Sequence, residues 1–319
     1  MSQQAQALQT ERILDDFAAA VIDGLSDFPR QIPCRYLYDA RGSELFEEIT
    51  QLEEYYPTRT EIGLLESHAA EIAELAGAGV VLIEFGSGSS RKTRLLIDAL
   101  QSLRAYVPID ISDSALSDAE QRLNSRYPRL AVLPVHADFN QQMDLPDQIC
   151  GARRIGFFPG STIGNFSRTE AENFLARAAK LLGPGSALVI GVDLKKDPKI
   201  LIPAYNDAKG VTAAFTRNLL ARINRELDGT LDLDAFAHRP VYNESAGRVE
   251  IYLESLTCQQ ASILDTTFCF SKGERIHVEN SHKYTVDGFQ EIAKEAGWTA
   301  AQCWVDKRDY FSIHFLKHD

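Results

Sequence analysis

Glycines and carboxylates at the ends of apolar runs are the residues of this chain best suited to chemistry. The apolar run from Val80 ends in Gly86-Ser-Gly88, and an amphipathic helical pattern begins at Arg91. Gly86 and Gly88 remove side chains where a ligand must approach the backbone, and a helix start offers free N–H groups. A strand, a tight loop and a helix in this order predict a site for a nucleoside-containing cofactor.

The glycine spacing indicates which cofactor. A dinucleotide loop reads G-x-G-x-x-G, and its third glycine lets the helix pack closely on the strand. Arg91 takes that third place here, and the acid Glu84 lies inside the preceding strand. Acid-x-Gly-x-Gly is the pattern of S-adenosylmethionine (SAM) methyltransferases, whose cofactor has no pyrophosphate to cradle. An ordinary Gly/Ser turn would also explain the loop, so the loop alone is a weak signal.

Two further strand ends carry suitable side chains. Asp110 ends the run from Ala105, near the spacing of about 20 residues at which an acid binds ribose hydroxyls. Asp138 and Phe139 end the run from Leu130; the carboxylate can accept from an adenine amino group, and the ring can pack on adenine. Asp138 alone could be a helix or turn cap. Three successive strand ends of this kind predict a SAM site.

Composition limits the class of protein. The 319 residues are 45% hydrophobic and 24% charged, which predicts a globular enzyme of one large or two modest domains. The net charge of −12 argues against nucleic acid and anionic membranes as partners. No apolar stretch has transmembrane length, the start is not a signal peptide, and the five cysteines contain no C-x-x-C pair. We expect a cytoplasmic protein with reduced thiols, by default a monomer. The histidine pairs lack a third ligand, so no metal site is expected.

Strand and helix patterns alternate from about 57 to 193, which predicts a doubly wound, mostly parallel α/β sheet. A helix over 286–296 and a hairpin over 301–316 add a terminal antiparallel strand, as in class I methyltransferases and unlike NAD dehydrogenases. The expected helices are 8–25, 61–76, 91–103, 113–126, 169–182 and 197–227, and the expected strands lie near 80–85, 105–110, 130–135, 155–158, 187–193, 248–254, 267–270 and 274–279.

These patterns divide the chain into two territories. Residues 57–196 and 284–319 are expected to form the SAM-binding methyltransferase domain. Residues 1–56, read as a helix followed by loop, and 197–283 are expected to form a second, α+β lobe that binds the substrate. We expect the active site in the cleft between this lobe and the carboxyl ends of the sheet strands.

Six segments spread along the chain carry further motifs. They are Tyr36–Phe46, Leu52–Glu61, 84–92, Gly160–Asn165, Ala204–Phe215 and Asn224–Leu227. Together they resemble the histidine-specific, SAM-dependent Nα-methyltransferases of ergothioneine biosynthesis, over essentially the whole chain. The resemblance implies a two-lobed enzyme that converts the α-amine of free L-histidine into a trimethylammonium in three methyl transfers. The products are trimethylhistidine (hercynine) and S-adenosyl-L-homocysteine.

The resemblance also implies a site, residue by residue. The cofactor positions are Gly86, Lys92, Asp110, Asp138 and Phe139, with Gly88 in the same loop. The substrate positions are Tyr55, Asn165, Tyr205, Glu279 and Ser281, and Tyr38 and Phe46 border the amine. Tyr38 and Asn165 are the expected catalytic residues. Tyr38 can accept a hydrogen from the amine, Asn165 and Tyr205 can donate to the substrate carboxylate, and the aromatic faces can stabilise the methylated cation.

Glu279 and Ser281 indicate how a side chain is selected. Two residues apart on a strand, they face the same way and can contact the two imidazole nitrogens. Without the resemblance, a solvent-facing polar strand edge would be the favoured explanation. Ile251 stands where the family has a methionine lining the imidazole pocket. The stiffer side chain leaves room for tryptophan or a tryptophan derivative as substrate, but retention of Glu279 and Ser281 favours histidine.

Two other classes of function compete. An NAD(P)-dependent oxidoreductase would share the Gly-rich loop and the strand-end acid, but Arg91 and the terminal hairpin argue against it. A silent SAM-binding scaffold would not need a complete set of substrate residues.

Overall fold

The computed structural model describes residues 3–87 and 91–319. The chain divides into two compact units: unit 1 consists of Met1–Tyr55 and Asp197–Ser281, and unit 2 consists of Tyr56–Lys196 and His282–Asp319. The boundaries expected from the sequence, after residues 56, 196 and 283, fall within two residues of these. Among the described residues, no helix is both long enough and apolar enough to cross a membrane.

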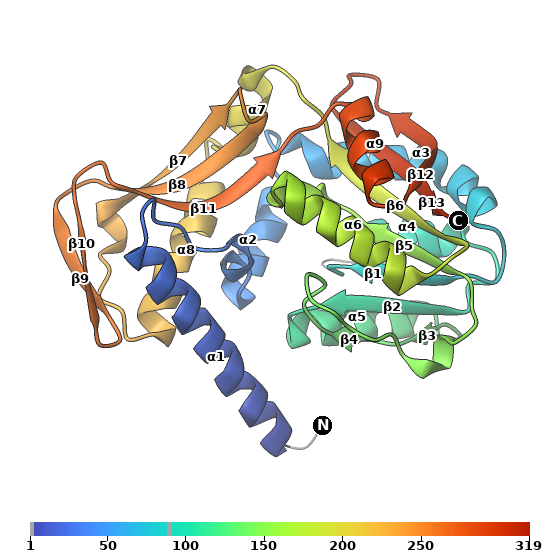
Figure 1. Ribbon diagram of the computed structural model, residues 1–319, viewed down its shortest axis with the longest axis horizontal. Coiled ribbons are helices and arrows are strands. Elements are labelled where there is room, and N and C mark those ends of the chain that lie inside the picture. The colour runs from blue at the N-terminus through green and yellow to red at the C-terminus, as the bar shows by residue number, and fades with distance from the viewer. Residues whose placement is uncertain (1–2, 88–90) are drawn as a thin grey trace. The chain divides into compact units, whose positions relative to one another are not determined.

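Unit 2 contains one sheet with the strand order β12-β13-β6-β5-β1-β2-β3 (Figure 1). The short strand β4 also pairs with β2, closer to the carboxyl end of β2 than β3 does. All pairs are parallel except those of β13, which is antiparallel to both β6 and β12. The predicted doubly wound sheet with a terminal antiparallel strand is therefore confirmed. The strands are β1 (Val81–Phe85), β2 (Ala105–Asp110), β3 (Ala131–Val132), β4 (Val135–His136), β5 (Arg154–Phe158), β6 (Ser186–Asp193), β12 (Thr299–Val305) and β13 (Phe311–His318).

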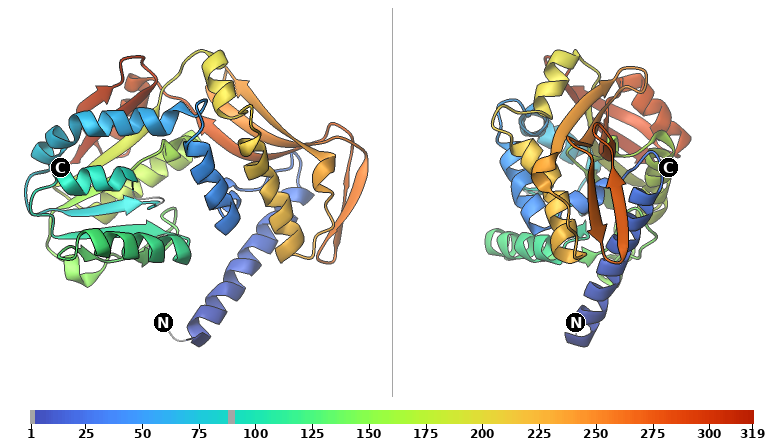
Figure 2. Two further views of the ribbon diagram at one scale, coloured as in Figure 1. Left: turned by 180° about the vertical axis from the view of Figure 1, so that it is seen from behind. Right: turned by 90° about the vertical axis from the view of Figure 1, so that its left-hand side faces the viewer.

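Helices cover both faces of this sheet. Leu82 of β1 packs in a core with α3 (Tyr56–Ala76), α4 (Arg91–Ala99) and α5 (Asp113–Arg126), the face seen at the left of Figure 2. Its neighbours Val81 and Ile83 pack in the opposite core with α6 (Arg168–Leu182) and α9 (Val286–Glu295). Because successive strand residues point to opposite faces, a fully apolar strand serves both cores.

Local signals explain where these helices begin. The predicted start of α6 is confirmed: the Ser167 side chain accepts from Glu170 N, and the Glu170 carboxylate accepts from Ser167 N, a capping box. The predicted start of α3 at Glu61 is wrong, because the helix begins at Tyr56 with Pro57 in its first turn, where proline is tolerated. The strand expected at 130–135 is interrupted, which leaves the two short strands β3 and β4.

Unit 1 combines helices with a three-stranded sheet of order β11-β8-β7 and a separate hairpin, β9 with β10. Its elements are α1 (Gln3–Ser26), η1 (Cys34–Leu37), α2 (Ala40–Thr50), α7 (Pro198–Ala204), α8 (Val211–Glu226), η4 (Leu233–Ala235), β7 (Phe236–Asn243), β8 (Arg248–Ser255), β9 (Gln259–Ile263), β10 (Thr266–Phe270) and β11 (Arg275–His282).

Two sequence-based expectations for unit 1 are wrong. The segment after the first helix was expected to be loop, but it contains α2, whose N-cap Asp39 accepts from Gly42 N at 2.7 Å. The single helix expected over 197–227 is two helices, α7 and α8, separated by residues 205–210. Tyr205 lies in this break, so the interruption belongs to the candidate site.

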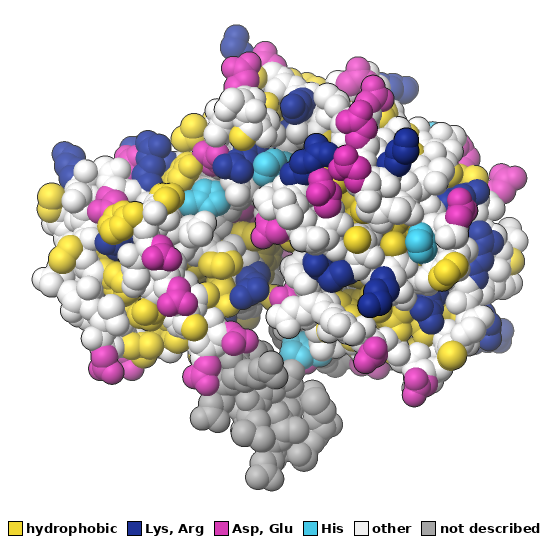
Figure 3. All heavy atoms as spheres, viewed as in Figure 1, with side chains coloured by type: hydrophobic (Ala, Val, Ile, Leu, Met, Phe, Trp, Pro, Cys, Tyr) yellow, Lys and Arg dark blue, Asp and Glu magenta, His cyan; other side chains and the backbone are white. Residues whose placement is uncertain are grey.

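Acidic and basic side chains are interspersed over the face shown in Figure 3, and neither sign dominates it.

Candidate functional site

The loops after β1 and β2 are joined by Asp110, the last residue of β2. Its carboxylate accepts from Ser87 N at 3.1 Å and from Ser112 N at 3.0 Å. Gly86 has φ +78°, a left-handed conformation that favours glycine, and its N–H donates to Ile109 O at 2.8 Å. The two cofactor positions therefore lie together at the carboxyl ends of adjacent parallel strands, where α/β proteins bind ligands.

The loop after β4 completes this group. A Cβ added at Gly86 would lie 3.7 Å from the ring edge of Phe139. Phe139 packs on the rings of Phe158 and Phe174, with centroids 5.6 and 5.9 Å away. The Asp138 carboxylate accepts from Asn140 N at 2.8 Å, which holds the loop in a turn. Gly86, Asp110, Asp138 and Phe139 are thus brought to one edge of the sheet.

Lys92 faces an acid that sequence analysis did not assign to the site. Its Nζ lies 2.6 Å from Oε2 of Glu61, a fully buried residue of α3. The same carboxylate accepts from Gly160 N at 2.9 and 3.0 Å. Glu61 therefore connects α4, which follows the cofactor loop, to the loop after β5. The predicted cofactor residue Gly88 lies outside the described residues.

Glu84, the acid of the loop motif, is a structural residue of β1. It is 2% exposed and accepts hydrogen bonds from the hydroxyls of Tyr106 and Thr93. Burial raises the pKa of Glu84 to about 8, although both hydrogen bonds act to lower it. Its side chain stabilises the strand beneath the loop.

Five aromatic residues of unit 1 form one group, the aromatic cluster: Tyr38, Phe46, Tyr55, Tyr205 and Phe215. The Tyr38 ring lies edge-on to Phe46 and Phe215, with centroids 5.5 and 5.3 Å away. Phe46 is 6.3 Å from Tyr55, and Tyr55 is 6.2 Å from Tyr205. Edge-to-face packing at these distances is favourable. Four of the predicted substrate-side residues are therefore neighbours.

Tyr38 is a neutral phenol. Burial, followed by the charge of Glu279, raises the pKa of Tyr38 well above its ordinary value of 10.0. At neutral pH its hydroxyl is available for hydrogen bonding and its ring for packing.

Two buried polar residues of unit 1, Glu279 and Ser281, lie on β11. The Tyr205 hydroxyl and Ser281 Oγ lie 2.7 Å apart, and Glu279 and Ser281 are only 9% and 5% exposed. Burial along β11 changes phase after Val278, so that Val278 and Glu279 are consecutive buried residues, and His277 bonds to Asn280 at 2.9 Å. Ile251 of β8 is fully buried in the same unit.

Asn165 belongs to unit 2. It ends η3 (Thr162–Asn165), the turn that follows β5. The turn starts at Ser161, whose φ of 57° is left-handed, and Gly164 N donates to Ser161 O at 2.8 Å. Asn165 is therefore held at the carboxyl end of a parallel strand, in the same unit as the cofactor positions.

Sequence reasoning missed two members of these groups. Phe215 is 2% exposed and contacts both Tyr38 and Phe46. Phe215 is the last residue of the motif 204–215, and this motif is the sequence feature that could have identified it. Glu61 is the last residue of the motif 52–61. Its link to the loop after β5 depends on a hydrogen bond from Gly160, which is far away in the sequence.

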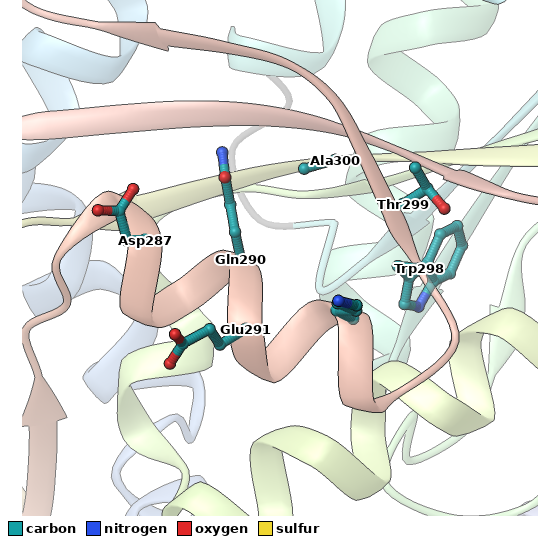
Figure 4. Close-up of a pocket in the computed structure, with 7 residues that line it drawn as sticks. Asp287, Gln290, Glu291, Trp298, Thr299 and Ala300 are labelled. Atoms are coloured by element: carbon teal, nitrogen blue, oxygen red, sulfur yellow. The ribbon is translucent and has the colours of Figure 1, made fainter.

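A surface hollow of about 340 Å³ lies elsewhere on unit 2 (Figure 4). It is lined by Asp287, Gln290, Glu291, Lys294, Trp298, Thr299 and Ala300. None of the predicted site residues is among them.

Comparison with known proteins gives one consistent result. Residues 17–318 match a family model described as histidine-specific methyltransferase, SAM-dependent. The histidine N-alpha-methyltransferase of Mycolicibacterium smegmatis is 40% identical over 295 residues, 91% of this chain and 91% of that protein. The enzyme of the same name from Mycobacterium tuberculosis is 39% identical over 299 residues, 92% of each chain. Ergothioneine biosynthesis protein 1 of Neurospora crassa is 33% identical over 302 residues, 91% of this chain and 33% of that protein.

Proposed function

Because the chain belongs to the histidine-specific, SAM-dependent methyltransferase family, we propose that it methylates the α-amino nitrogen of free L-histidine and produces trimethylhistidine (hercynine) for ergothioneine biosynthesis. The chain is an enzyme that uses SAM, and the oxidoreductase and scaffold alternatives are set aside.

One observation carries the choice of histidine. Glu279 and Ser281 are both buried on β11, and Ser281 is bonded to Tyr205. A buried carboxylate and hydroxyl match the two nitrogens of an imidazole. A buried polar pair also rejects side chains that leave it without partners.

The chemistry assigns complementary tasks to the two units. Bound SAM supplies an electrophilic methyl group on a sulfonium. In unit 2, Asp110 accepts from the ribose hydroxyls, Asp138 accepts from the adenine amine, and Phe139 packs on the adenine ring. In unit 1, Tyr205 and the β11 pair hold the amino acid. Methyl transfer is an in-line displacement, so rate depends on how well the amine is oriented.

The aromatic cluster suits the later transfers. Histidine enters with an ammonium group, which has no lone pair, so one proton is released to solvent before each methyl transfer. After three transfers the nitrogen carries three methyl groups in place of its three hydrogens and is a permanent cation. The neutral Tyr38 accepts a hydrogen bond from the amine while hydrogens remain. The faces of Tyr38 and Phe46 then stabilise the trimethylammonium through cation–π attraction.

Substrate competition tests this proposal. The chain is incubated with SAM and each free amino acid, and release of S-adenosyl-L-homocysteine gives kcat/KM. We expect histidine to exceed tryptophan and phenylalanine by at least about 100-fold. A comparable or higher kcat/KM for another amino acid would assign this chain a different substrate.

We also propose a monomeric enzyme of the cytoplasm that acts without nucleic acid or membrane. The net charge of −12 supports this, because it disfavours anionic partners. Light scattering during size exclusion should give one mass near 35.5 kDa; a dimer mass would contradict it.

A further inference from the structure

Four buried side chains of unit 2 form an ionic group, the Asp193 cluster. The Tyr56 hydroxyl donates to the Asp193 carboxylate, with oxygen–oxygen distances of 2.7 and 2.9 Å. Lys196 Nζ lies 2.6 Å from one carboxylate oxygen and Lys283 Nζ 2.7 Å from the other. The side chains of Lys196, Lys283 and Asp193 are at most 4% exposed, and Tyr56 is 2% exposed. None of these four side chains has a role in the proposed reaction.

The two lysines keep the central carboxylate ionised. Burial would raise the pKa of Asp193, but the attraction of Lys283 and Lys196 outweighs it, and the pKa is lowered. Replacing a buried ionic group by apolar residues is often neutral or stabilising, so such a group is weak evidence for stability. A role in fixing geometry is a better reason for placing four polar side chains here.

The cluster's members lie where the chain enters and leaves unit 2. The chain passes between units after Tyr55, Lys196 and Ser281. Tyr56 is the first residue of unit 2, Lys196 is the last residue before the second passage, and Lys283 is the second residue after the third. One carboxylate therefore fixes the unit 2 end of all three passages.

The same carboxylate-bearing residue also holds the loop that contains Asn165. Asp193 N donates to Ser161 Oγ at 2.9 Å. Tyr284 N donates to Asp193 O at 3.0 Å, and the Tyr284 hydroxyl donates to Ile163 O at 3.3 Å. A Cβ at Gly164 would lie only 2.8 Å from His282 O, so the turn and the third passage are packed backbone to backbone.

We propose that the Asp193 cluster is a positioning site for methyl transfer: it fixes the chain next to Tyr55 and Ser281 and the turn that carries Asn165. The inference rests on the proposed function and on Tyr55, Asn165 and Ser281 being the substrate positions that the family resemblance implies. Asp193, Tyr56 and the two lysines act through them and do not touch the substrate.

Tyr56→Phe tests this with the smallest change, because it removes one hydroxyl and keeps the ring. We expect kcat/KM for histidine to fall about tenfold, since a small misplacement of binding groups slows an oriented reaction. The Kd of S-adenosyl-L-homocysteine, measured by calorimetry, should change less than about twofold, because the cofactor positions have other supports. Tyr127→Phe is the matched control: it deletes a hydroxyl bonded to Asp98 at 2.6 Å in the same unit, and should leave kcat/KM unchanged.

A double-mutant cycle separates positioning from general stability. If Tyr56 acts through the third passage, Tyr56→Phe and Ser281→Ala should have non-additive effects on kcat/KM. Tyr284→Phe, which removes only the bond to Ile163 O, gives a second variant that should lower kcat while the histidine KM changes little. Additive effects, or a Tyr56→Phe enzyme that loses thermal stability while its kcat/KM matches that of Tyr127→Phe, would overturn the inference. A parent chain that leaves histidine unmethylated would instead overturn the proposed function, and this inference with it.

Discussion

At the scale of residues, the proposed selectivity for histidine rests on a few buried polar atoms beside an aromatic cluster. Glu279 and Ser281 have the burial that a specific site requires, and Tyr205 is bonded to one of them. The pKa of Tyr38 is raised by burial, which fits the proposed role of its phenol in orienting the amine. Substitutions at these positions should therefore change substrate use more than folding.

Glu279→Ala removes the carboxylate that is proposed to face an imidazole nitrogen. We expect kcat/KM for histidine to fall about tenfold or more, because a buried hydrogen-bond partner of the substrate is lost. Asn280→Ala is the matched control, since its half-buried neighbouring side chain bonds to His277. Steady-state kinetics on both variants measures the difference; equal values for Glu279→Ala and the parent would remove histidine recognition from β11.

Ile251→Met tests the remaining substrate alternative. Ile251 is fully buried on β8, and a flexible thioether changes the shape available to a substrate ring. With histidine and tryptophan present together, the ratio of methylated products should differ between parent and variant. A ratio that stays the same would show that residue 251 does not tune the choice.

At the scale of elements, the sequence predicted what local patterns determine. Apolar runs alternating with amphipathic helices predicted β1, β2, β5, β6 and their helices, because burial on two faces leaves a strong signal. α2 was missed, since Gly42 and Ser43 in its first turns are poor helix formers and tertiary packing decides. β7 was missed because it contains Pro240, which an edge strand tolerates.

The site residues likewise divide into those that local sequence patterns predict and those that only the fold brings together. The strand-end residues Asp110 and Asp138 were predictable from position in the sheet. The resemblance supplied the substrate residues, because no local pattern distinguishes Glu279 from a polar strand edge. Glu61 and the Asp193 cluster were not predictable, since their partners are distant in sequence and only the fold brings them together.

Glu84→Gln tests the support beneath the cofactor loop. Burial raises the pKa of Glu84 from 4.5 to about 8, so the folded protein keeps a proton that the unfolded chain releases at lower pH. The stability from this proton is fully present below pH 4.5 and is lost as pH rises toward 8. Glutamine cannot titrate. The melting temperature of the parent minus that of Glu84→Gln should therefore decrease from pH 5 to 8.5; a constant difference would contradict the raised pKa.

At the scale of the whole molecule, the predicted site residues are distributed over two compact units. The cofactor positions and Asn165 lie in unit 2, and the aromatic cluster with β11 lies in unit 1. Substitution of a predicted cofactor position should therefore weaken cofactor binding, and substitution in the aromatic cluster or β11 should lower use of the amino acid.

Asp110→Ala should act on the cofactor alone. The Kd of S-adenosyl-L-homocysteine is expected to rise about tenfold or more, because hydrogen bonds from the ribose to a charged group are lost. Asp113→Ala, at a carboxylate that is 58% exposed, is the control. Calorimetry on both variants, and on Glu279→Ala, should show weaker binding only for Asp110→Ala. Unchanged cofactor affinity in Asp110→Ala would refute this assignment.

The most direct test of the central claim follows the methyl groups themselves. The chain is incubated with L-histidine and SAM carrying a CD3 methyl group, and the product is fragmented in a mass spectrometer. The account predicts histidine carrying three CD3 groups, all on the α-nitrogen, with the imidazole unlabelled. Label on the imidazole ring, or histidine that remains unlabelled, would contradict it.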